Sequence, residues 1–367
     1  MLTGQNGILN RASEAKEKTE VAQKDENEKM QGYEDIINKY TGNLPSKEET
    51  KPYFPSSTFS YKEGDLNTGL VINDSYGNEY VWVEVPKTTE VYSTAGISIT
   101  NFTDEEYTKI ENDLKGYTKD YSDENYNDTN PDFTQQYRNM LKSVYTNGGF
   151  WIGRYEAGYE ENTTRTSHVE LAESDKAVIK KNRLPWIYVT RYEAKILAER
   201  MNYGDCKGNL IFGIQWDLVL KYIEEKTVAV TEENKKTTVR TDIKNKLTSN
   251  STMIGNYKTN LWNITNTNAK YSLNNGISFI SCPYQKESEE RVMLTTGADE
   301  SFSLMNIYDI AGNVWEWTLE FGGTSYPSVN RGGSYYHIGS VAPAMNRYGN
   351  NINSSSSDFG FRVGLWK

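Results

Sequence analysis

The amino-acid sequence predicts an α+β protein in which a long N-terminal helix precedes a globular domain. Three observations support this prediction: an amphipathic pattern near the N-terminus, a segment with the alternation of a strand, and later stretches with helical spacing. The 367 residues are enough to bury a sizeable core. With 27 Tyr, 8 Trp and only 36% hydrophobic residues, the composition indicates an irregular fold with many Tyr side chains at its surface.

Residues 8–40 are predicted to form one continuous helix. Apolar and small residues recur there at steps of three and four, which places them in a narrow stripe along one face. Gly42 and the residues that follow it are expected to end the helix. The other faces carry Glu and Lys four residues apart in the favourable order, as in the pairs Glu14–Lys18 and Glu20–Lys24.

A linker is expected over residues 44–75, because this stretch is rich in Pro, Ser and Thr and poor in apolar residues. The globular domain is expected over residues 76–367. Its first strand is predicted at residues 80–86, where apolar side chains alternate with others. A helical insertion is predicted at about residues 100–146, and a capping box that begins at Thr103 starts the first of its two helices.

Two more helices are predicted in the middle of the domain. Residues 189–201 combine a Thr at the expected N-cap position with apolar residues at helical spacing. Residues 212–225 show a second such pattern. The polar stretch 226–275 is expected to consist mostly of loops.

Charge and cysteine content exclude several classes of function. The formal net charge of −10 and the isoelectric point near 5.0 argue against a nucleic-acid partner, because phosphate binding needs clustered Lys and Arg. No run of 18 apolar residues and no signal peptide is recognised in the sequence. Cys206 and Cys282 are too few for a disulfide scaffold, and both a single bridge and two buried free thiols remain open.

Three motifs near the C-terminus carry a family resemblance. They are NIYDIAGNVWEW at residues 306–317, RGGSY at residues 331–335, and GFR at residues 360–362. Their order and spacing resemble the formylglycine-generating enzyme, or sulfatase-modifying factor, superfamily over roughly residues 76–367. The resemblance implies an α+β domain with a C-type-lectin-like fold of the formylglycine-generating-enzyme type.

The resemblance does not extend to the catalytic residues of that family. Its oxidase activity needs two cysteines after the RGGS turn, whose thiolates bind copper, and those positions here hold His337 and Ala342. A related branch binds non-haem iron through three histidines, and this chain has only His168 and His337. Neither copper nor iron is therefore expected, and catalytic residues are not assigned. A formylglycine-generating-type oxidoreductase stays as an alternative function.

The family also binds calcium through the Gly-Asn-x-x-Glu part of its first motif, which here supplies Asn313 and Glu316. The alternative is that Asn313 caps the turn while Glu316 pairs with a nearby arginine. Family scaffold arginines correspond to Arg331, Arg347 and Arg362, and buried arginines usually pair with carboxylates or carbonyls. The residues expected to hold the fold are Trp315, Trp317, Arg331, Gly360 and Arg362.

Residues 334–359 are poor in charge and rich in Tyr, Ser, Asn and Gly, the mixture that antibody loops use for binding. Their location resembles the variable region of diversity-generating retroelement proteins, which change residues on this scaffold. The resemblance implies a face that binds an unknown protein or glycan ligand. An ordinary polar loop is the alternative. The candidate ligand-binding residues are Tyr335, Tyr336, His337, Asn346, Tyr348, Asn351 and Asn353.

The first segment, residues 1–43, resembles the N-terminal helix of type IV pilin-like proteins of Gram-positive bacteria. The resemblance lies in LTGQNGILNRASEAKEKTE at residues 2–20. In those proteins an apolar membrane-spanning stretch comes before this segment. Met1 is therefore expected to replace a deleted membrane segment, which makes the chain a soluble truncation of a membrane- or pilus-anchored surface protein. A solvated helix or coiled-coil arm is the structural alternative.

Ligand binding at the cell surface or outside the cell is the function that these observations favour together. Other pilin subunits are expected as further partners if the pilin-like interpretation holds. The remaining alternative is a minor structural pilin subunit.

Overall fold

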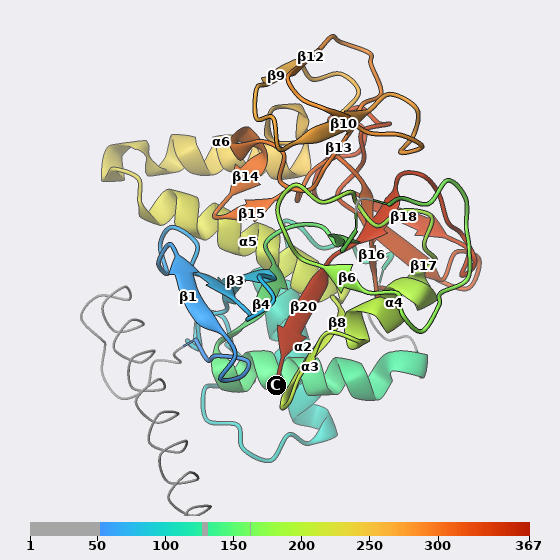
Figure 1. Cartoon of the computed structure of the whole chain (residues 1–367). Coiled ribbons are helices and arrows are strands. Elements are labelled where there is room, and N and C mark those ends of the chain that lie inside the picture. The colour runs from blue at the N-terminus through green and yellow to red at the C-terminus, as the bar shows by residue number, and fades with distance from the viewer. Residues whose placement is uncertain (1–51, 127–130, 162) are drawn as a thin grey trace, which may run out of the picture.

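The computed structural model describes residues 52–126, 131–161 and 163–367. The helix predicted at residues 8–40 lies outside the described residues, as does the start of the predicted linker. The described part combines one large sheet, several small sheets and five α-helices (Figure 1). No helix within these ranges is long and apolar enough to cross a membrane.

A seven-stranded antiparallel sheet forms the centre of the molecule. Its middle strands are buried on both faces, which explains their dense apolar and aromatic sequences. The last strand of the domain, β20, lies in the middle of this sheet, between β4 and β8 (Figure 1). The strand order is β1 (Ser60–Glu63), β2 (Val71–Asn73), β3 (Glu79–Glu84), β4 (Gly149–Gly153), β20 (Val363–Trp366), β8 (Cys206–Leu210) and β7 (Asn202–Tyr203).

The predicted linker is wrong over its second half. Strands β1 and β2 both lie before residue 76, and β2 pairs directly with β3. Phe59, Leu70 and Val71 are buried in the main core. The two strands are only four and three residues long, and the polar turn between them hides their few apolar residues in the sequence.

Both helices predicted for the insertion are present. Helix α2 (Asp104–Tyr117) begins with the expected capping box, in which the amide of Glu106 donates to Thr103 Oγ1 at 3.3 Å and Thr103 N donates to Glu106 Oε2 at 2.8 Å. Helix α3 (Thr134–Asn147) follows a 3-10 turn at Pro131–Phe133 and buries Met140, Leu141 and Val144. It contacts β4 and β20, so the insertion covers the large sheet.

Two other predicted helices are present, and one helix was missed. Helix α4 (Arg191–Glu199) has Thr190 as its N-cap, and α5 (Gly213–Ala229) is buried along most of its length. Helix α6 (Lys236–Thr248) lies within the stretch expected to be loops. It buries only Ile243 and Leu247 and packs on α5, so too few apolar positions signalled it in the sequence.

Several small sheets are formed by short strands between residues 158 and 308. They pair β5 (Gly158–Tyr159) with β6 (Ala177–Val178), β9 (Trp262–Ile264) with β12 (Tyr284–Lys286), and β14 (Ser303–Leu304) with β15 (Ile307–Tyr308). Strands β11 (Ile280–Ser281), β10 (Lys270–Ser272) and β13 (Met293–Leu294) form a three-stranded sheet. A second apolar cluster around Trp262 and Phe302 stabilises this region. Further 3-10 turns span Glu233–Lys235, Thr252–Ile254 and Glu300–Phe302.

A four-stranded sheet brings the three C-terminal motifs together. Its order is β18 (Arg347–Asn350), β17 (Ser328–Arg331), β16 (Trp315–Thr318) and β19 (Phe359–Phe361). Strand β16 pairs antiparallel with β17 and parallel with β19. The segment between β17 and β18, and that between β18 and β19, together contain most of the residues expected to bind a ligand.

Candidate ligand-binding site

The Trp residues of the first motif anchor the four-stranded sheet. Trp315 and Trp317 on β16 are both buried, and Trp317 Nε1 donates to the carbonyl of Val189 at 2.8 Å. Since residues opposite each other in a sheet share a face, Trp317, Asn330 and Tyr348 lie on one face. Val189 immediately precedes the N-cap of α4, so this face of the sheet is held against the start of that helix.

The opposite face holds the family arginines. Arg362 forms a bidentate ion pair with Glu316, with nitrogen-to-oxygen distances of 2.6 and 2.9 Å, and both residues are buried. Burial opposes the charged guanidinium, but the Glu316 carboxylate outweighs it and raises the pKa of Arg362. A scaffold role for Arg362 therefore follows from its geometry, because removing either partner would leave a buried charge unpaired.

Arg331 and Arg347 share two buried carboxylates, Asp217 and Glu320. Arg331 donates to Asp217 at 2.6 Å and to Glu320 at 3.0 Å, while Arg347 contacts each of the same two carboxylates at 2.6 Å. The four charges balance, and the network ties β17 and β18 to α5 through Asp217. Both arginines thus have the carboxylate partners expected of scaffold residues.

A second buried cluster consists of three carboxylates and one arginine, namely Glu156, Asp309, Glu316 and Arg362. Burial, followed by the charges of Asp309 and Glu316, raises the pKa of Glu156 well above its usual value. Burial raises the pKa of Asp309 to about 7, although the amide of Gly297 donates to it at 2.7 Å. The cluster therefore takes up a proton near neutral pH.

Asn313 and Glu316, the candidate calcium ligands, already have protein partners. Asn313 Nδ2 donates to Glu156 Oε2 at 2.7 Å, and its Oδ1 accepts from the amide of Leu294 at 3.0 Å. Both carboxylate oxygens of Glu316 accept from Arg362. In this arrangement the two residues do not fit a calcium ion, which needs several free oxygen ligands. The described residues contain no group of three or more His, Cys, Asp or Glu that could hold a metal.

Tyr335 differs from the other candidate ligand-binding residues. It is completely buried and packs with Ile187, Met293 and Val314 in a small apolar cluster. Its hydroxyl donates to Asn275 Oδ1 at 3.3 Å. The expectation that Tyr335 forms part of an exposed face is therefore wrong, because the residues following the RGGS turn still belong to the core.

His337 and Tyr348 surround Trp315. The Tyr348 ring is stacked on Trp315 with centroids 5.6 Å apart and planes at 25°, and 49% of Tyr348 is exposed. The His337 ring meets Trp315 edge-on at 5.3 Å, and its Nδ1 lies 2.9 Å from Ser334 Oγ. Burial lowers the pKa of His337, which favours the neutral ring at neutral pH. A rigid buried indole thus supports one exposed tyrosine ring.

The remaining candidates lie at the surface around this platform. Tyr336 is half-buried beneath the guanidinium of Arg291, which lies 3.8 Å from the ring centroid. Asn351 and Asn353 are exposed, and Asn346 is half-buried with its side-chain amide donating to Val341 O at 3.3 Å. Except for Tyr335, the candidate residues therefore keep part of their surface exposed.

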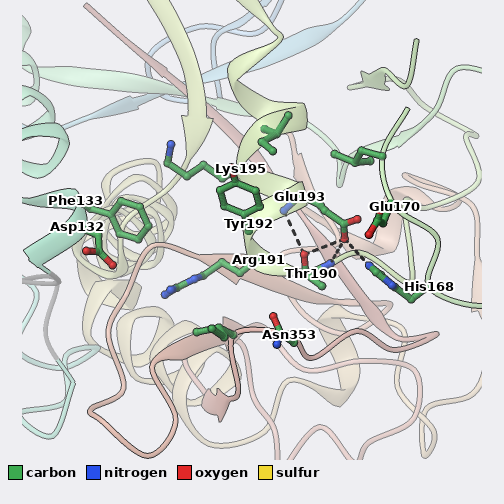
Figure 2. A pocket seen from close by; sticks show the side chains of 13 residues that line it. Asp132, Phe133, His168, Glu170, Thr190, Arg191, Tyr192, Glu193, Lys195 and Asn353 are labelled. Atoms are coloured by element: carbon green, nitrogen blue, oxygen red, sulfur yellow. Dashed lines mark hydrogen bonds and ion pairs between the residues drawn. The ribbon is translucent and has the colours of Figure 1, made fainter. Parts of the chain in front are cut away.

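A groove of about 760 Å³ opens where the predicted segment meets α4. Figure 2 shows Arg191 extending towards Asp132 and Phe133 on one side, while His168, Glu170 and Glu193 lie on the other. His168 Nε2 lies 3.0 Å from Glu193 Oε2, which also accepts from Thr190. Within the predicted binding segment, Ile352 and Asn353 line this groove.

Sequence reasoning missed most of the groove. Its walls come from four separate places in the chain, and its helix was recognised only as a core element. A signal was present in Arg191, a cation at the first position of a helix, where the helix dipole disfavours positive charge. The residues that line the groove are Asp132, Phe133, His168, Glu170, Leu171, Thr190, Arg191, Tyr192, Glu193, Lys195, Ile196, Ile352 and Asn353.

The two cysteines are buried free thiols in separate apolar clusters. Burial raises the pKa of Cys206 to about 12 and that of Cys282 to about 11, so both stay protonated at neutral pH. Neither lies in the candidate site, and Ala342 at the second family cysteine position is buried.

Comparison with known proteins identifies the family of this chain. A family model, the sulfatase-modifying factor enzyme 1-like domain, matches residues 61–365. Treponema denticola variable protein 1 and a crystal structure of CarF are each 14% identical to this chain, with a TM-score of 0.31. Each match covers 60% of this chain, and 85% and 87% of those chains respectively. No curated protein matches. Because the family model spans most of its length, the chain belongs to the sulfatase-modifying factor family, with its C-type-lectin-like α+β fold.

Proposed function

We propose that this protein binds a protein or glycan ligand through the binding face, defined as Tyr336, His337, Asn346, Tyr348, Asn351 and Asn353. The observation that carries the proposal is the half-exposed Tyr348 ring stacked on the buried Trp315. An aromatic ring held by a rigid support loses little conformational entropy on binding, and it offers both apolar area and a hydroxyl group.

The scaffold supports side-chain variation on the binding face. Strands β17 and β18 are held by buried ion pairs and by Trp315, and these do not depend on Asn351 or Asn353. Exposed residues on such a support can change at little cost in stability. Diversification of residues 334–359 by a retroelement is part of this proposal, and comparing the coding DNA of this segment between isolates would test it.

We place the protein on the cell surface or outside the cell, anchored through the pilin-like N-terminal segment. Other pilin subunits are proposed partners of that segment. No role in formylglycine formation is proposed, because the two positions that carry thiolates in the oxidases hold His337 and Ala342. Copper-dependent conversion of a Cys-x-Pro-x-Arg peptide would overturn this part of the proposal.

The ligand can be sought by probing glycan and protein arrays with the labelled full chain. A Tyr348→Ala variant should lose binding to any genuine hit. The control is Tyr76→Ala, which removes another exposed tyrosine, from the turn between β2 and β3. The proposal fails if both variants bind the hit as well as the unchanged chain does.

A further inference from the structure

Arg191 is the exception among the buried arginines. Within the described ranges, Arg154, Arg191, Arg331 and Arg362 are more than nine-tenths buried. The other three pair with carboxylates. For Arg191, no carboxylate among the described residues lies within the 4.0 Å of an ion pair. A buried guanidinium that forms no ion pair with the described residues is costly, and at the edge of a groove the carboxylate of a ligand can supply the counter-charge.

The surroundings of Arg191 leave its charge only partly satisfied. One terminal nitrogen, Nη1, donates to the carbonyl of Pro327 at 2.9 Å and more weakly to that of Glu320 at 3.5 Å. Burial lowers the pKa of Arg191 to about 10, although the charge of Asp132 opposes this, and the guanidinium remains cationic at neutral pH. Its position at the start of α4 adds the unfavourable helix dipole.

The groove beside Arg191 is apolar but edged with acid groups. Phe133, Leu171, Ile196 and Ile352 line it, and the Arg191 guanidinium lies 5.5 Å from the Phe133 ring centroid. Glu170 and Glu193 lie on the opposite side from Asp132 and Phe133 (Figure 2). These carboxylates would repel a polyanion, whereas a single carboxylate could reach the guanidinium.

We propose that this groove binds the carboxylate of a peptide segment from a protein ligand, with Arg191 pairing to the carboxylate. The apolar walls then pack against the neighbouring apolar side chain of the same segment. The lining combines aliphatic and aromatic side chains with one cation, so a peptide that carries an apolar side chain beside a carboxylate matches both kinds of surface. This inference rests on the proposed function, since Ile352 and Asn353 join the groove to the binding face.

The carboxylate has two sources, an acidic side chain or a peptide C-terminus, and matched probes distinguish them. The first pair is acetyl-Leu-Phe-Glu amide and acetyl-Leu-Phe-Gln amide. The second pair is acetyl-Leu-Phe-Leu with a free C-terminal carboxylate and the same peptide as an amide. Dissociation constants for the full chain can be measured by saturation-transfer NMR. In at least one pair, the acid should bind about tenfold tighter or more, as expected for a charge-assisted pair.

Two variants connect this preference to the groove. Arg191→Gln should abolish the preference for the acid, while Arg183→Gln, an arginine outside the groove, should not. Ile352→Glu keeps Arg191 and its contacts but adds a carboxylate to an exposed groove position, so it should also abolish acid binding. Val341→Glu is its matched control at another exposed apolar position of the same segment.

Several results would overturn the inference. These are equal binding of acid and amide, no binding of either acidic peptide, selective binding of glucuronic acid in place of the peptides, or an acid preference that survives both groove variants. This inference can also fail while the proposed function stands. If an array hit is lost in Tyr348→Ala but is unaffected by Arg191→Gln and Ile352→Glu, the binding face stands and the carboxylate groove does not.

Discussion

At the scale of single residues, burial separates the side chains that hold the site from those that are free to contact a ligand. Trp315 is buried, whereas Tyr348, stacked on it, is half exposed. Trp315→Ala should therefore lower the free energy of unfolding by about 3 to 5 kcal/mol. Tyr348→Ala should cost much less, because an exposed ring loses little packing. Urea denaturation of both variants checks this, and a larger loss for Tyr348→Ala would contradict the assignment.

Asp309 should make stability depend on pH. Its pKa is raised to about 7 by burial, so between about pH 4 and pH 7 the folded chain holds a proton that the unfolded chain has released. This group therefore stabilises the fold most at low pH, and that contribution is lost as the pH rises through 7. Asp309→Asn keeps an acceptor for the amide of Gly297 and suits the positive φ of 56°.

The variant should show a smaller fall in urea midpoint between pH 4.5 and pH 7.5 than the unchanged chain. The control is Asp299→Asn, a half-buried aspartate whose side chain also accepts from a backbone amide. Identical pH profiles for the unchanged chain and Asp309→Asn would show that Asp309 titrates normally in the folded state.

The residue-scale predictions from sequence succeeded where a motif specifies packing. Trp315, Trp317, Arg331 and Arg362 are all buried, as expected for residues that hold the fold. Tyr335 was misplaced because composition marks a polar segment without showing where the core ends. That Arg191 donates to carbonyls and forms no ion pair with a described carboxylate could not be predicted, since this depends on which groups distant segments bring near.

At the scale of elements, strong local signals were read correctly and weak ones were not. The Thr103 capping box and the apolar spacing of α4 and α5 each act over a single turn or helix face. In contrast, β1 and β2 are too short for a recognisable alternation, and they become strands by pairing with the long β3. Helix α6 likewise depends on packing against α5.

The helix predicted at residues 8–40 and the strands β1 and β2 make separable predictions. Removing residues 1–51 should reduce the helical signal in far-UV circular dichroism while leaving a cooperative melting transition, because the described sheet stays complete. Removing residues 1–75 also deletes β1 and β2 and should lower the melting temperature or prevent folding. An unchanged spectrum after the first deletion would contradict the predicted helix at residues 8–40. Unchanged melting after the second would contradict a stabilising role for the two strands.

At the scale of the whole molecule, buried ion pairs and hydrogen bonds connect the C-terminal motifs to the rest of the fold. The oxygens of Glu316 and Asn313 already accept hydrogen bonds from protein groups. Adding a calcium chelator should therefore leave the melting temperature unchanged, because only an ion bound by the folded state would stabilise it by mass action. Calorimetry with EDTA and with added calcium checks this. A drop with EDTA that calcium restores would indicate an ion elsewhere in the chain or a rearranged motif.

The central claim is that one face of the molecule binds a ligand while a separate buried scaffold holds the fold. The most direct test measures both properties on one variant, in which Tyr336, Tyr348, Asn351 and Asn353 are replaced together by alanine. Using a hit from the glycan or protein arrays, titration calorimetry gives the dissociation constant and urea denaturation gives the stability. The account predicts that binding is lost while the free energy of unfolding changes little. Undiminished binding, or unfolding of the variant, would contradict it.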